Sequence, residues 1–145
     1  MLPPGDIPPN PRLWLESRVV KTKERVPNEP EHLTWIKAPL NRWARLLDLD
    51  LESVRAHGVY VIWHGGYPTR VVKIGHGDLA AGLAACRKDA RVTGYAKEGP
   101  LFVTWAAADA SHAAGIARHL EGILRPLLED HAGANVVAIA ANSPF

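Results

Sequence analysis

The sequence predicts a small α/β (α+β) domain, in which a mainly antiparallel sheet of three to four strands is flanked by helices. Two short β-rich runs, joined by a segment that contains glycine and proline, indicate a hairpin. Apolar residues at three- and four-residue spacing predict helices around these runs and around a third one. The length of 145 residues fits one domain with an N-terminal extension.

Residues 1–57 are predicted to form that extension, and residues 58–145 the domain itself. Residues 1–11 contain five prolines, which is typical of an extended arm. Residues 13–26 mix basic and β-branched side chains, which favours a strand with a charged face. Leu40, Trp43, Leu46 and Leu47 form an apolar stripe, so we expect a helix over about residues 40–54.

The second part of the chain alternates between the two kinds of element. Residues 58–64 and 71–75 are the strands of the hairpin, residues 101–106 form a further strand, and residues 136–140 are expected to form a final short one. Gly77-Asp78 predicts the start of a helix that places Leu79, Leu83 and Cys86 on one face. Ser111 is a suitable cap for a later helix that kinks or ends at Pro126.

Charge and composition exclude few functions. A net charge of +2, from 17 basic and 15 acidic residues, does not by itself indicate a nucleic-acid partner. A single cysteine cannot form an internal disulfide, so we expect a reducing, cytoplasmic setting. We expect no signal peptide and no membrane association, because the chain has neither a basic, apolar start nor a run of about 18 apolar residues.

The hairpin carries a resemblance to a known family. Gly58-Val59-Tyr60 is followed after a turn by Lys73-Ile74-Gly75, and Asn142-Ser143-Pro144 stands near the end of the sequence. This order and spacing resembles the GIY-YIG nuclease superfamily, over about residues 58–145. The resemblance implies a small sheet with helical cover. It also implies an endonuclease, a metal-dependent phosphodiesterase that acts on DNA with Mg²⁺ or Mn²⁺.

The residues that cut the phosphodiester in that family are only partly present. Tyr60 matches the first tyrosine, which positions the attacking water, and Lys73 stands in place of the second. The family's arginine, which neutralises phosphate charge, corresponds to Gly82, and its metal-binding glutamate corresponds to Ala117. Because the chemistry needs both charges, the resemblance implies a catalytically degenerate pseudoenzyme that keeps the fold and a nucleic-acid-binding cleft.

Two alternatives remain open. An active variant nuclease would use Tyr60, Lys73, Arg87 and Glu121, with Glu121 holding the metal ion. A cleft repurposed for a small molecule would use Tyr60, Lys73 and His76 as its polar cluster, since fold does not determine function. Gly82 is informative under every alternative, because a glycine inside a helix costs about 1 kcal/mol relative to alanine. We therefore expect another group to approach the helix closely there.

Overall fold

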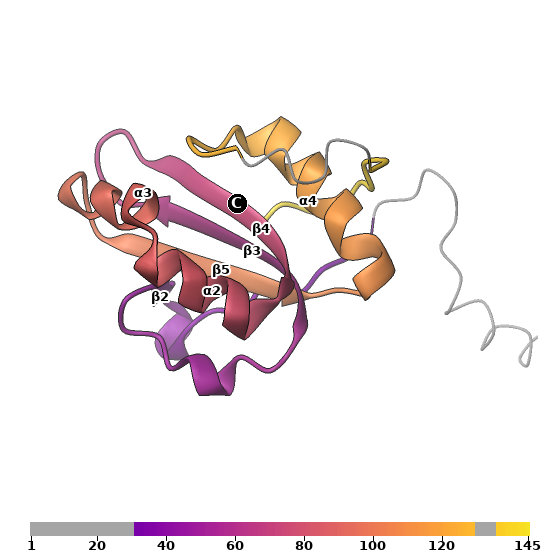
Figure 1. Cartoon of the computed structure of the whole chain (residues 1–145), viewed down its shortest axis with the longest axis horizontal. Coiled ribbons are helices and arrows are strands. Elements are labelled where there is room, and N and C mark those ends of the chain that lie inside the picture. Colours follow the sequence, from indigo (N-terminus) through magenta and orange to yellow (C-terminus); the bar gives the residue numbers. More distant parts are fainter. Residues whose placement is uncertain (1–30, 130–135) are drawn as a thin grey trace, which may run out of the picture.

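The computed structural model describes residues 31–129 and 136–145, and in this part of the chain four antiparallel strands form one sheet in the order β2-β5-β3-β4 (Figure 1). The strands are β2 (Ala44–Arg45), β3 (His57–His64), β4 (Arg70–Asp78) and β5 (Leu101–Ala107). Helices flank the sheet, so the predicted fold class is confirmed. The arm at residues 1–11 and the strand expected at residues 13–26 lie outside the described residues.

The helices divide between the two faces of the sheet. The α-helices are α2 (Leu79–Lys88), α3 (Ala90–Thr93) and α4 (Ala110–Leu124), and the short 3-10 turns are η1 (Pro39–Asn41), η2 (Leu51–Ser53) and η3 (Gly94–Lys97). Figure 1 shows α2 on one side of the strands and α4 on the other. Two separate hydrophobic cores result, one under each helix.

Strand β3 supplies both cores because successive side chains of a strand point to opposite faces. Tyr60 and Ile62 pack with the buried residues of α2, on what we call the α2 face. Val59 and Val61 pack with the buried residues of α4, on the α4 face. Every residue of β3 from Gly58 to His64 is buried, which explains why this stretch of sequence is almost uniformly apolar.

The pairing register of the hairpin decides which residues share a face. Tyr60 lies opposite Gly75 and Ile62 lies opposite Lys73, and directly opposed residues of antiparallel strands project to the same side. The register then shifts between Ile62 and Trp63, which marks a β-bulge. The bulge leaves Val72 as an extra residue on the α2 face. The predicted hairpin is therefore confirmed, and Tyr60 and Lys73 lie on one face of it.

The ends of the two long helices follow capping chemistry. The Asp78 carboxylate accepts a hydrogen bond from the Ala81 N–H at 3.4 Å and so begins α2 where the sequence predicts it. Helix α4 begins two residues earlier than a Ser111 cap would place it. Its cap is Asp109, which accepts hydrogen bonds from the N–H and the hydroxyl of Ser111, each at 2.8 Å. The helix ends in a left-handed residue, Arg125, directly before Pro126.

The helix predicted for residues 40–54 is wrong. Leu40 and Asn41 have positive φ angles of 66° and 58°, which no α-helix contains. Strand β2 instead pairs with β5, and the Leu46 N–H donates to the Leu101 carbonyl at 2.9 Å. Hydrogen bonds to a distant strand thus outweigh the local helical pattern. Leu46 is fully buried, so this segment belongs to the same sheet and core as residues 58–145.

The final strand predicted for residues 136–140 is also wrong, since only Ala141 forms a bridge, with Glu31. The neighbouring contact uses a side chain instead of a strand ladder. The Asn142 side chain accepts from the Leu33 N–H at 2.6 Å and donates to the Leu33 carbonyl at 2.9 Å. An amide side chain can pair with a backbone in this way because it carries both a donor and an acceptor.

Candidate functional site

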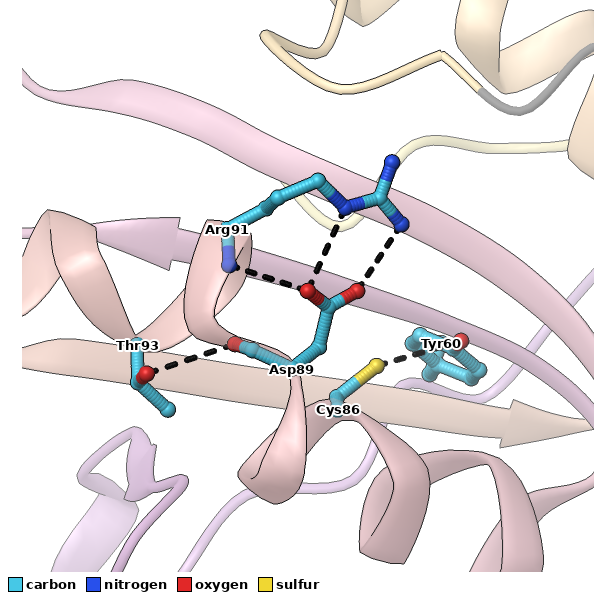
Figure 2. Close-up of polar contacts among 5 residues, drawn as sticks. All are labelled: Tyr60, Cys86, Asp89, Arg91 and Thr93. Atoms are coloured by element: carbon cyan, nitrogen blue, oxygen red, sulfur yellow. Dashed lines mark hydrogen bonds and ion pairs between the residues drawn. The ribbon is translucent and has the colours of Figure 1, made fainter.

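Tyr60 is a buried residue, although the family resemblance would make it the group that positions water. Its side chain is 5% exposed and lies in the core under α2. The phenol oxygen stands 3.4 Å from the Cys86 sulfur, as Figure 2 shows. A cysteine thiol is a weak hydrogen-bonding group and behaves mainly as a small hydrophobe when buried. The surroundings of Tyr60 are therefore those of a packed core residue.

Two glycines make room for the Tyr60 ring. A Cβ atom at Gly75 would lie 2.2 Å from the phenol oxygen, and a Cβ atom at Gly82 would lie 3.0 Å from the ring atom Cε2. The first distance is a clash and the second a tight contact. The ring is thus the close approach that the sequence leads us to expect at Gly82. The space beside position 82 is occupied by an aromatic ring.

A charged group follows Cys86 closely, at the junction of α2 and α3 (Figure 2), where the Asp89 N–H donates to the Cys86 carbonyl at 3.2 Å. The Asp89 carboxylate caps α3 by accepting from the Arg91 N–H at 2.9 Å, and it also accepts from Nη2 of Arg91 at 2.9 Å. These hydrogen bonds hold the pKa of Asp89 below its usual value, and those from the Arg91 side chain have the largest effect. The positive charge of Lys73 lowers the pKa of Asp89 further, as the smallest of the contributions.

A pocket of about 440 Å³ opens next to this ion pair. Its lining residues are Arg91, Gly94, Tyr95, Lys97, Glu98 and Leu128. Lys73 borders the same region, because its backbone forms a bridge with Leu128. Tyr95 is held in place by stacking on His64, with ring centroids 6.0 Å apart and planes 11° apart. Two cations, one carboxylate (Glu98) and an aromatic ring therefore line one hollow, with a third cation beside it.

The sheet separates two of the other predicted site residues, His76 and Glu121, from Tyr60 and Lys73. His76 pairs with Val59, so its exposed side chain projects to the α4 face. Glu121 belongs to α4 and lines a different pocket, together with Arg118 and His119 among others. Tyr60, Lys73 and His76 consequently do not share a face, and Glu121 is carried by the layer opposite to the one into which Tyr60 packs.

Arg87 has a structural role. Its Nε donates to the Leu46 carbonyl at 2.9 Å, and its Nη2 donates to the Leu49 carbonyl. These two bonds tie the segment after β2 to the last turn of α2. The variant-nuclease alternative would use Arg87 in its catalytic site, whereas in the structure two of its donors serve backbone carbonyls.

Among residues 31–129 and 136–145, no group of three or more histidine, cysteine, aspartate or glutamate side chains is arranged to hold a metal ion. No helix in this part of the chain has the length and apolar character needed to cross a membrane.

The sequence analysis did not single out Asp89, Tyr95 or Lys97. Asp89 did have a signal in the sequence. It directly follows the basic end of α2, and aspartate is a preferred residue for capping the start of a helix, as it does here for α3. Tyr95 and Lys97 had no such signal. They lie on η3, outside every predicted element, and only the fold brings them next to Arg91.

The packing of Tyr60 predicts that Gly75→Ala destabilises the protein by about 1–3 kcal/mol, because the new methyl group overlaps a buried ring that has little space to move. The matched control is Gly122→Ala in α4, where a Cβ atom would meet nothing within 4 Å. The control should stabilise the protein by about 0.4–1 kcal/mol. Urea unfolding measures both, and equal midpoints for wild type and Gly75→Ala would refute the packing argument.

The anchoring role of Arg87 predicts that Arg87→Ala lowers the free energy of unfolding by about 1.5–3 kcal/mol, through the loss of two charge-assisted hydrogen bonds. The neighbouring exposed residue gives the control, since Lys88→Ala should change stability by no more than about 0.5 kcal/mol. Thermal unfolding followed by circular dichroism compares the two variants. A Lys88→Ala effect as large as that of Arg87→Ala would contradict this role.

The Asp89–Arg91 pair predicts a measurable pKa change. In Arg91→Gln the pKa of Asp89 should rise toward its usual value of 3.8. A lowered pKa stabilises the fold fully above pH 3.8, and that stabilisation is lost as the pH falls through the folded-state value. Wild type should therefore lose more stability than the variant over this acid range. Carboxyl-detected NMR titration measures the pKa, with Arg118→Gln on α4 as the control, and an unchanged Asp89 pKa in Arg91→Gln would disprove the pairing.

Comparison of the chain with protein-family models, with curated proteins and with solved structures finds no match.

Proposed function

We propose that this chain is a GIY-YIG-like domain that has lost DNA cleavage and binds nucleic acid through a basic surface formed by Lys73, Arg91 and Lys97. The observation that carries the proposal is the burial of Tyr60. A phenol that positions an attacking water must reach solvent and substrate, whereas this one packs against Gly75 and next to Cys86. A cytoplasmic location is part of the proposal, supported by the single cysteine.

The positions of the relocated charges also support the loss of cleavage. Phosphodiester hydrolysis of this kind needs a cation and a metal ion beside the nucleophile, in fixed geometry. Arg87 donates to two backbone carbonyls, and Glu121 lies on α4, across the sheet from α2. An active variant that uses Tyr60, Lys73, Arg87 and Glu121 with Mg²⁺ or Mn²⁺ is therefore the weaker candidate.

Binding is supported by the chemistry of the basic surface. Arginine and lysine are the usual phosphate ligands of proteins, and Arg91 keeps 63% of its side chain exposed beside Asp89. Tyr95 adds a partly exposed aromatic ring to the same pocket. A repurposed small-molecule site built on Tyr60, Lys73 and His76 has less support, because His76 projects to the α4 face.

The test is one set of mixtures with two measurements. The full chain is incubated with single- and double-stranded DNA and Mg²⁺ or Mn²⁺, and both cleavage and fluorescence anisotropy are followed. We expect binding without cleavage. Lys73→Gln and Lys97→Gln should each weaken binding and reduce the slope of log affinity against log salt by about 0.9, since each removes one phosphate contact.

Arg118→Gln on α4 is the charge-matched control and should leave binding unchanged. Protein-dependent cleavage that disappears in Tyr60→Phe would overturn the proposed loss of activity. Wild-type binding by the Lys73→Gln and Lys97→Gln variants would overturn the proposed binding surface.

A further inference from the structure

Four aromatic rings gather at the edge of the α4 face, away from the basic surface. Trp63 lies at the centre, with ring centroids 5.1 Å from Trp43, 5.7 Å from Phe102 and 4.9 Å from Phe145. Trp63 is only 4% exposed, whereas Phe145 is 58% exposed. We call these four residues the aromatic platform. Trp63 is therefore fixed in the core, and the Phe145 ring faces solvent.

Cations border the aromatic platform. The Lys37 ammonium lies 4.4 Å from the centre of the Trp43 ring, and the Arg45 guanidinium lies 5.8 Å from the centre of the Phe102 ring. Both distances are within the range of cation–π attraction. Residues 37–47 carry Lys37, Arg42 and Arg45 but no acidic residue. The surface therefore combines exposed aromatic carbon with a local excess of positive charge.

This combination selects among possible ligands. An ammonium ligand, which aromatic rings often bind, is disfavoured because two cations already lie on these rings and would repel a third. An apolar ligand would match the rings but not the charges. A ligand with a flat aromatic face next to anionic groups matches both, and unpaired nucleotides have this structure. In a duplex the base faces are already stacked on one another and are not available.

We infer that the aromatic platform binds single-stranded nucleic acid, with an unpaired base stacked on Phe145 and the adjoining phosphates near Lys37 and Arg45. The inference deepens the proposed function and rests on it for the class of ligand, but it uses a different surface. Phe102 pairs with Trp63 on the α4 face, while Lys73 lies on the α2 face. The inference also names the preferred ligand, which is single-stranded and not duplex nucleic acid.

The test follows the intrinsic fluorescence of the full chain, since two tryptophans belong to the aromatic platform. Oligo(dT), oligo(rU) and an abasic oligonucleotide of equal length are titrated, and affinities are checked by anisotropy. The abasic strand should bind more weakly than oligo(dT), and a stronger response to dT or to rU separates DNA from RNA. Phe145→Ala should weaken binding of the base-containing strands about 5- to 100-fold, with no change in the salt slope because no charge is removed.

The controls separate stacking from loss of structure. Tyr67→Ala removes a fully exposed aromatic residue from the turn between β3 and β4, and it should bind like wild type. Phe145→Leu keeps most of the apolar volume but no aromatic face, so it should bind as weakly as Phe145→Ala while its circular dichroism stays that of wild type. Lys37→Gln and Arg45→Gln should each lower the salt slope.

Two patterns decide between this inference and the proposed function. If Lys97→Gln weakens binding but both Phe145 variants bind like wild type, the basic surface stands and the aromatic platform is refuted. If the Phe145 variants weaken binding and Lys97→Gln does not, the aromatic platform stands and the basic surface is refuted. Equal affinity for the abasic strand and oligo(dT) would overturn the inference on its own.

Discussion

The contact of the Tyr60 ring with two glycines is the constraint on which the α2 side of the molecule depends. Gly75 on β4 and Gly82 on α2 both lie against the ring, and Cys86 closes the space around the hydroxyl. A larger side chain at position 82 would crowd the ring and force it to shift from its present place. The glycine at position 82 and the burial of the phenol are therefore one structural fact and not two.

The sheet explains which charges can act together. Because pairing puts opposed residues on the same side, Tyr60 and Lys73 face α2 while His76 faces α4. The loop that connects α2 to α3 brings Asp89 and Arg91 to the first group. The structure thus offers two candidate contact surfaces with different chemistry. One is a pocket of cations around Tyr95, and the other is a set of rings with cations at its border.

Much of the fold was predictable from the sequence, and the failures share one cause. The hairpin, α2, β5 and α4 follow local signals, namely alternating or helical apolar spacing with caps such as Asp78. Residues 40–54 and 136–140 are shaped by distant partners, Leu101 for the former and Gly115 and Glu31 for the latter. Spacing along one segment carries no information about such partners, because their hydrogen bonds depend on the rest of the fold.

The site was less predictable than the fold. Hairpin pairing was enough to place Tyr60 and Lys73 together. Helical spacing alone could not reveal that Arg87 donates to the carbonyls of Leu46 and Leu49. It also could not reveal that Glu121 lies on α4, across the sheet from α2. The rings of the aromatic platform come from four separate segments, so no motif could have indicated them.

The pairing of Asn142 with Leu33 has a consequence for how the molecule is made. These residues are 109 positions apart in the chain, and the contact holds both the N–H and the carbonyl of Leu33. Contacts of such long sequence separation form late, because a large loop must close before they contribute. During synthesis, the ribosome must therefore have released the chain as far as Asn142 before Leu33 finds this native partner. Until then, this edge of the nascent protein is exposed to chaperones and proteases.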